Sequence, residues 1–338
     1  MIIYEQNFFG LTTSNISSKF KYYVAGSITI GVSNSRWSSN TSGARIGPTT
    51  DITAAVTGSN PIYCGMAVKQ DAGNAFYIGF LANGTLHVNL ESFNGLITVR
   101  RAGTATLATY TIPNYAANNW YYYEFGAVIS DTSGSVEVRL NENTVISASN
   151  VDTQNGGVAS LYVNEVALDH AISPTNYNVT DWYVTNTNGS NPATNGFLGD
   201  IQIFSTVPDA SGDVINFLPL SSSNALMVDD GNSPDNDVTY VSSSLSGSMD
   251  LFKTTTYTGS LTNVYGMGVK VLTRKLDPGS RDIQLVIKSG SQMAFFETQS
   301  VLDSYRYTTA FFETNPNTGT AWSSMSDVNN TQIGYTII

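Results

Sequence analysis

The chain has 338 residues, of which 41% are hydrophobic and only 12% are charged, about half of the roughly 25% charged residues usual in soluble domains. Its formal net charge of −11 rests on 15 Lys and Arg against 26 Asp and Glu. These few, scattered basic residues argue against a nucleic-acid partner, because binding to a phosphate backbone needs them clustered.

Membrane and secretion signals are also missing from the sequence. No apolar run approaches the roughly 18 residues needed to cross a bilayer, and no Lys or Arg precedes the short apolar start. The sequence therefore predicts a protein without a membrane partner or a signal peptide. The apolar N-terminal segment, residues 1–9, is either the first strand of its own sheet or an edge that contacts another chain.

Trp37 and Cys64 each support a prediction about one side chain. Trp37 lies in the polar stretch SNSRWSSN, which predicts an exposed ring and makes it the candidate for a glycan contact. Cys64 is the only cysteine, so no disulfide forms within the chain. Its place in the alternating run IYCGMAVK predicts a small, buried hydrophobic side chain.

Strand signals dominate the middle of the chain. From Phe76 to Ala102 three apolar runs are separated by Asn83-Gly84 and Asn94-Gly95, and Asn-Gly pairs supply the positive φ angles of tight hairpin turns. A three-stranded meander is predicted here.

A second hairpin follows at residues 120–140. Tyr121, Tyr123 and Phe125 alternate with other residues before a turn at 131–134. After the turn, Val136, Val138 and Leu140 are predicted to share one face of the returning strand.

The second half of the chain contains a predicted domain boundary. Residues 158–172 fit neither the helical nor the strand period, whereas GDIQIF, 199–204, reads as a strand that leads into a Pro- and Gly-containing turn. Later runs predict strands at 264–275, 282–290 and 332–338, and a single helical turn within 322–330. The fold class predicted is all-β, with a larger domain over 1–205 followed by a smaller β-sandwich over 206–338.

The acidic residues give little support to glycosidase chemistry, which needs two carboxylates facing one another. No Glu-x-Asp-x-x-Glu run occurs, and the isolated glutamates are predicted to be solvated: Glu91, Glu124, Glu137, Glu142 and Glu165. His87 and His170 have no metal-like partner at short spacing, and no nucleotide-binding loop is present. The sequence therefore predicts no catalytic residue and no cofactor.

One loop carries several candidate ligands for a hard cation such as Ca²⁺, which prefers carboxylate and carbonyl oxygens. The candidates are Asp229, Asp230, Asp235 and Asp237. Pro234 and the missing glutamate at the twelfth position depart from the EF-hand pattern, so the alternative is a polar connection between strands. The basic cluster RKLDPGSR, 274–281, is interpreted as a solvated turn.

Longer strings of this sequence resemble one family of phage proteins. They are FLGDIQIFSTVPDASGD (197–213), NALMVDDGNSPDNDVTYVSS (224–243) and RKLDPGSRDIQLVIKSG (274–290), together with the opening residues 1–20 and the hairpin region 120–156. The chain resembles tailed-phage minor structural proteins built on a laminin G-like, concanavalin A-type jelly roll. The resemblance implies that the domain over 1–205 is such a jelly roll.

This resemblance implies a non-enzymatic virion component, made in the host cytoplasm and attached to a capsid, neck or tail as a fibre, decoration or adaptor. The expected partners are other virion proteins and further copies of the chain, because low charge leaves strand edges unprotected. The expected form is a trimer, or otherwise a ring that matches the symmetry of the attachment site. Two alternatives stay open: an adhesin that binds a host-surface glycan, and a glycoside hydrolase.

Overall fold

The computed structural model describes residues 1–6, 22–24, 28–31, 34–37, 43–46, 51–156, 160–168, 176–231, 234–259 and 263–338. The chain divides into two compact units, Met1–Ser205 and Thr206–Ile338. The fold is all-β, as predicted: a concanavalin A-like jelly roll followed by a smaller β-sandwich. Within the described ranges, no helix has the length and apolarity that a bilayer span requires.

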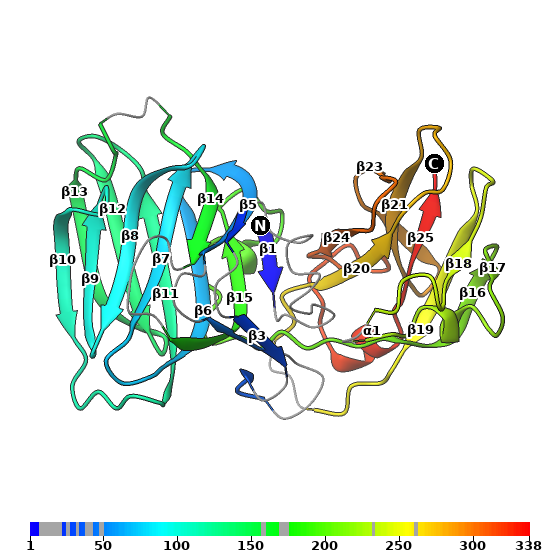
Figure 1. Ribbon diagram of the computed structural model, residues 1–338, viewed down its shortest axis with the longest axis horizontal. Helices are drawn as coiled ribbons and strands as arrows, with labels where there is room; N and C mark the ends of the chain where they lie inside the picture. Colours follow the sequence, from blue (N-terminus) through cyan, green and yellow to red (C-terminus); the bar gives the residue numbers. More distant parts are fainter. Residues whose placement is uncertain are drawn as a thin grey trace. The chain divides into compact units, whose positions relative to one another are not determined.

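The first unit consists of two antiparallel sheets, which Figure 1 shows as two layers. In the described part of the chain, sheet I contains, in spatial order, β13 (Asn143–Val151), β12 (Gly134–Leu140), β11 (Trp120–Val128), β6 (Ile62–Gln70), β15 (Tyr177–Thr185), β4 (Gly43–Ile46) and β3 (Ile28–Gly31), with β1 (Ile2–Gln6) paired to β15. Sheet II contains β10 (Ala105–Thr111), β9 (Leu96–Arg101), β8 (Thr85–Phe93), β7 (Ala75–Ala82), β14 (Val163–Leu168), β5 (Asp51–Ser59) and β2 (Tyr22–Val24).

The turns of sheet II form as the sequence predicts. Asn83 and Gly84 have φ angles of 50° and 80°, and Asn94 and Gly95 have 48° and 79°. Such paired positive values define the two-residue turns whose twist matches antiparallel strands. The meander over β7, β8 and β9 is confirmed, with each strand paired to the next.

Aromatic rings from both sheets fill the space between them. Phe80 of β7 stacks on Phe125 of β11 with ring centroids 4.6 Å apart, and Phe76 lies 5.1 Å from Tyr123 and 5.3 Å from Tyr177. Large buried rings of this kind dominate the energetics of a core. The predicted hairpin β11–β12 is also confirmed, with Tyr123 opposite Leu140.

Two segments that the sequence left unassigned each contain a strand. The N-terminal segment forms β1, which pairs antiparallel with β15 over Ile2–Gln6; residues 7–9 lie outside the described residues. The 158–172 stretch contains β14, whose residues are almost all buried. A strand that is buried on both faces shows no alternation, and this explains why its sequence fits neither period.

The second unit is built on a larger sheet and two ribbons. Within the described residues, the larger sheet contains β16 (Pro208–Ile215), β19 (Met249–Thr254), β25 (Gln332–Ile337), β21 (Asp282–Ser289) and β22 (Gln292–Phe295), with β23 (Gln299–Ser300) paired to β21. The ribbons are β17 (Leu218–Pro219) with β18 (Val241–Ser242), and β20 (Met267–Thr273) with β24 (Arg306–Phe312).

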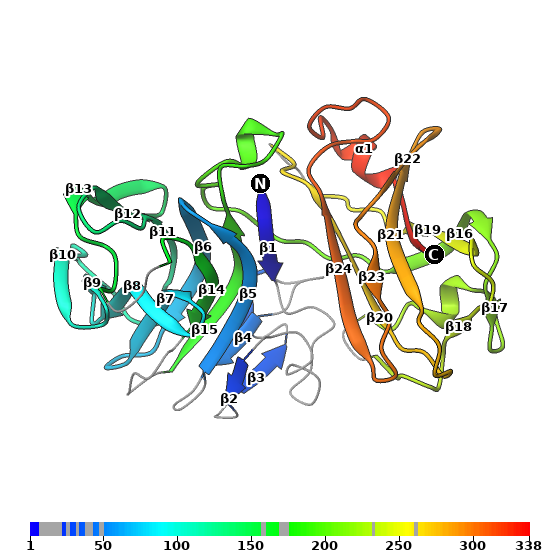
Figure 2. The same cartoon turned by 90° about the horizontal axis from the view of Figure 1, so that it is seen from above.

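A separate apolar core holds the second unit together. Leu285 of β21, Phe252 of β19 and Phe312 of β24 are all buried in it, so the β20–β24 ribbon packs on the larger sheet (Figure 2). The predicted helical turn is confirmed as α1 (Met325–Asn329), capped by the side chain of Ser324. Two short 3-10 turns, η3 (Pro192–Thr194) and η4 (Ala225–Met227), complete the described helices.

Candidate functional site

The segment that leaves the jelly roll, residues 197–203, is named the exit segment. The sequence prediction of a strand over 199–204 is wrong, since these residues form no strand. Side chains of sheet I, instead of a neighbouring strand, accept hydrogen bonds from the backbone N–H groups of Leu198, Gly199 and Ile203. The apolar alternation of the segment arises because it lies half-buried on the sheet.

The first anchor of the exit segment is a row of three residues across sheet I. Glu124 of β11 lies opposite Gly65 of β6, which lies opposite Tyr183 of β15. A Cβ atom on Gly65 would lie 2.6 Å from Cζ of Tyr183, so the ring of Tyr183 crosses β6 directly over this glycine. Its hydroxyl thereby reaches Glu124 and donates a hydrogen bond to Oε1.

A second glycine of the sheet accommodates Phe197. A Cβ atom on Gly126 would lie 2.7 Å from Cζ of Phe197. The Phe197 ring also meets Tyr63 edge-on, with centroids 4.9 Å apart, and the guanidinium carbon of Arg139 lies 4.3 Å from its centroid. An aromatic ring held between a cation and a second ring is a specific contact, so Phe197 fixes where the exit segment begins.

Glu124 is completely buried, and the predicted solvated position is wrong for this residue. Its Oε1 also accepts the N–H of Gly199 at 2.8 Å. Burial raises the pKa of Glu124, against the opposing hydrogen bonds from Tyr183 and Gly199 and the charge of Arg139, while Glu142 adds to the rise. The covering exit segment is the physical reason, and no pattern within β11 signals it.

Glu165 is the second glutamate for which a solvated position is wrong. It is 4% exposed, and its Oε2 accepts the backbone N–H of Gly84 at 3.1 Å. The Glu165 carboxylate thus stabilises the β7–β8 turn. Glu91, Glu137 and Glu142 keep contact with solvent, as predicted.

The second anchor is Asp181, which lies in a bulge of β15. The register passes from Thr180 opposite Ala67 to Tyr183 opposite Gly65, and Asp181 has a φ of 54°. Aspartate tolerates this left-handed conformation better than most residues. The bulge directs the buried carboxylate toward the exit segment, where Oδ1 accepts the N–H of Ile203 at 2.9 Å.

Arg36 and Trp37 complete this anchor. Both donate to Oδ2 of Asp181, from Nε of Arg36 at 3.0 Å and from Nε1 of Trp37 at 2.8 Å. Arg36 also bonds Asp200 of the exit segment. Burial raises the pKa of Asp181, and the charge of Arg36 and the hydrogen bonds from Ile203 and Trp37 oppose that rise.

Trp37 differs from its predicted exposed state. The ring is half-buried, and the guanidinium carbon of Arg36 lies 4.6 Å from its centroid. Because its N–H is bonded to Asp181, the indole has a structural role beside the candidate role in glycan contact. Polar neighbours in the sequence could not reveal this contact, since Asp181 lies far away along the chain.

Replacing Glu124 with glutamine should remove a pH-dependent loss of stability. The folded-state pKa of Glu124 is raised above its ordinary 4.5, so its contribution is fully present below that value and is lost as the pH rises toward the folded pKa. Glu124→Gln keeps an acceptor oxygen without a charge. The variant should therefore be the more stable protein at neutral pH, measured by denaturant unfolding at a series of pH values.

The control for this experiment is Glu137→Gln, on the neighbouring strand, whose carboxylate keeps contact with solvent. The Glu137 variant should keep the pH-dependent loss of stability that the wild type shows. Parallel profiles for the wild type and Glu124→Gln would contradict the assignment of a buried, proton-binding Glu124.

The four aspartates of the predicted cation loop do not converge. Asp230 and Asp235 both accept hydrogen bonds from Thr239, whereas Asp237 accepts from Arg274 at 2.6 Å and from Tyr305 at 2.7 Å. Asp229 is half-buried in the same loop. Among the described residues, which omit 232–233 of this loop, no group of three or more acidic, His or Cys side chains is placed to hold a metal ion.

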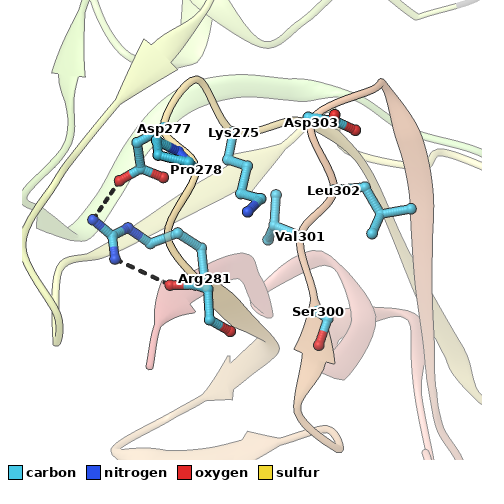
Figure 3. Close-up of a pocket in the computed structure, with 9 residues that line it drawn as sticks. Lys275, Asp277, Pro278, Arg281, Ser300, Val301, Leu302 and Asp303 are labelled. Atoms are coloured by element: carbon cyan, nitrogen blue, oxygen red, sulfur yellow. Dashed lines mark hydrogen bonds and ion pairs between the residues drawn. The ribbon is translucent and has the colours of Figure 1, made fainter.

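A pocket of about 420 Å³ lies beside the basic turn of the second unit (Figure 3). Its lining residues are Lys275, Asp277, Pro278, Ser280, Arg281, Ser300, Val301, Leu302 and Asp303. Arg281 donates to Asp277 at 2.5 Å and to the carbonyl of Ser280 at 3.0 Å, and Lys275 donates to the carbonyl of Gly279. The charged groups of Lys275 and Arg281 are therefore bonded within the turn, whereas Arg274 bonds Asp237 outside it.

The histidine and cysteine side chains that the structure describes are buried in the fold. His87 is buried, and its Nδ1 accepts the backbone N–H of Asn155 at 3.2 Å; burial lowers the His87 pKa, against the opposing backbone of Ser160. His170 lies outside the described residues. Cys64 is buried as predicted, with its Sγ 3.3 Å from Nε1 of Trp182, and burial raises the pKa of its thiol.

Several solved structures are similar to part of this chain. The galectin LEC-6 of Caenorhabditis elegans has 13% identity and a TM-score of 0.29, and the match covers 42% of this chain and 96% of the galectin. The alginate lyase Aly36B has 11% identity and a TM-score of 0.37, covering 54% and 96%. The carbohydrate-binding module CBM66 of Bacillus subtilis has 13% identity and a TM-score of 0.30, covering 48% and 89%.

These low identities and TM-scores carry no conclusion about function. No protein-family model and no curated protein sequence matches the chain.

Proposed function

We propose that this chain is a non-enzymatic structural component of a tailed-phage particle. The non-enzymatic part of the proposal rests on the hydrogen bonds that two buried carboxylates of the jelly roll accept. Glu124 and Asp181 both accept backbone N–H groups of the exit segment, which covers them. A glycosidase instead needs two carboxylates that flank a bound sugar.

The virion part of the proposal is supported by the resemblance of residues 197–213, 224–243 and 274–290 to phage minor structural proteins. In this role the chain attaches to a capsid, neck or tail as a fibre, decoration or adaptor. It forms a homo-oligomer with other virion proteins as neighbours, and a trimer is its expected form. Glycan binding is the second candidate function, and the half-buried ring of Trp37 is its candidate contact.

A reconstruction of the intact particle tests this proposal directly. We expect density for both β units at a fixed position, with copies related by the symmetry of the attachment site. Light scattering over a concentration series should show an oligomer of the purified chain. A monomer at every concentration, together with no copy on the particle, would contradict the proposal.

Screening for turnover tests the non-enzymatic part separately. The purified chain should release no reducing ends from bacterial surface polysaccharides or β-glucans. Release that disappears in Glu124→Gln or in Glu91→Gln would overturn this part in favour of a glycoside hydrolase.

A further inference from the structure

One face of the β17–β18 ribbon in the second unit is apolar and uncovered. Val241 of β18 packs against the core of the unit, and register places Pro219 of β17 opposite it. Strand alternation therefore places Leu218 and Leu220 on the outward face, where they are 73% and 50% exposed. The N–H of Leu220 donates to the carbonyl of Tyr240 at 3.0 Å, so both leucines belong to the ribbon. Neighbouring exposed aliphatic side chains of this kind mark an interaction surface.

The loop that leads into β18 adds negative charge beside these leucines. No Lys or Arg occurs between residues 206 and 252. Thr239, two residues before β18, is bonded to both Asp230 and Asp235, which keeps their carboxylates close to the ribbon. Burial raises the pKa of Asp230, and the charges of Asp235 and Asp229 add to the rise. In the described part of the chain these three aspartates have no ion-pair partner.

The pocket beside the basic turn has the opposite charge. Backbone hydrogen bonds from Lys275 to Leu302 and from Val301 to Arg281 hold its two walls side by side (Figure 3). Pro278, Val301 and Leu302 contribute apolar surface to the lining. The ammonium group of Lys275 donates to a backbone carbonyl, so no carboxylate neutralises it. The volume of about 420 Å³ lies within the roughly 300 to 1,000 Å³ of pockets that bind ligands.

The ribbon and the pocket complement one another in polarity and charge. Docking would bring aliphatic side chains together and place the acidic loop beside Lys275, whereas two ribbons face to face would bring carboxylates together. The acidic loop likewise disfavours an anionic membrane or a nucleic acid on the ribbon. Within one chain the ribbon does not reach the pocket, whose lining contains no residue of it. A second copy of the chain can supply both surfaces.

We propose that the ribbon of one chain, through Leu218 and Leu220, docks into the pocket of a second copy. This inference rests on the proposed homo-oligomer and names the surfaces that form it. Each chain offers one ribbon and accepts another, and a contact between two different surfaces can close a ring. Such a ring suits the expected trimer.

Sedimentation velocity of the full chain over a concentration series tests the docking. Leu218→Lys places a second cation beside Lys275, and Leu302→Asp places a carboxylate against the acidic loop, so each should weaken association at least about tenfold. Both side chains are exposed in the single chain, so the variants should fold normally. Leu161→Asp changes an exposed leucine of the first unit; it is the matched control and should associate like the wild type.

Mixing the two variants separates ribbon-to-pocket docking from a contact between like surfaces. The Leu302→Asp chain keeps an intact ribbon and the Leu218→Lys chain keeps an intact pocket. An equimolar mixture should therefore associate more strongly than either variant alone.

The outcomes distinguish this docking from the proposed function. An oligomeric wild type whose Leu218→Lys or Leu302→Asp variant associates equally well overturns the docking and leaves the homo-oligomer in place. A mixture that associates no better than its components overturns it too. A wild type that is monomeric at every concentration overturns both the docking and the homo-oligomer, whereas the position on the particle is decided by the reconstruction alone.

Discussion

Asp181→Ala should destabilise the first unit by about 3 to 5 kcal/mol, the cost typical of removing one partner from a buried ion pair. Asp181 is fully buried, and the Arg36 side chain that bonds it is only 11% exposed. The substitution also leaves the N–H groups of Trp37 and Ile203 without their acceptor. Chemical unfolding, followed in the first unit by hydrogen-exchange mass spectrometry, measures the loss.

Two further substitutions separate the causes. Asp181→Asn keeps a residue that tolerates the φ of 54° and keeps an acceptor oxygen, so it should lose clearly less stability than alanine. Asp181→Gly removes the backbone strain together with the carboxylate, so its loss should match alanine to within about 1 kcal/mol. An alanine variant as stable as the wild type would show that Asp181 does not anchor the exit segment.

Gly65→Ala should cost about 3 kcal/mol, a large effect for one methyl group. The new Cβ would lie 2.6 Å from Cζ of Tyr183, so the ring must move. Its hydroxyl then leaves Glu124, and the N–H of Leu198 loses its acceptor. The thermal unfolding transition of the first unit should fall accordingly.

Gly156→Ala is the matched control, because a Cβ there meets nothing within 4 Å and should change stability little. The double variant Gly65→Ala with Tyr183→Leu should be more stable than the sum of its single losses predicts, since the shorter side chain relieves the clash. Strict additivity of the two changes would contradict the packing of Tyr183 over Gly65.

The sequence predicts those parts of the fold that depend on neighbouring residues. The Asn-Gly turns at Asn83 and Asn94 and the helical turn capped by Ser324 depend on local backbone preferences, and these predictions are confirmed. The strand β14 could not be predicted, because burial on both faces removes the alternation on which strand prediction depends.

The anchors of the exit segment could not be predicted, because each joins residues far apart in sequence. Glu124 looks like one polar position of an alternating strand, and only the fold brings Gly199 over it. Trp37 looks exposed among serines and asparagines until the bulge of β15 presents Asp181 to it.

Because the exit segment is bonded to sheet I, the cooperative folding unit extends beyond β15. The amides of Leu198, Gly199 and Ile203 are bonded to side chains of sheet I, so we expect them to exchange with solvent only when the exit segment detaches from that sheet. They should therefore be protected although they belong to no strand. A fragment cut after β15 would leave the carboxylates of Glu124 and Asp181 uncovered, whereas a fragment that extends to Ser205 keeps its own cover.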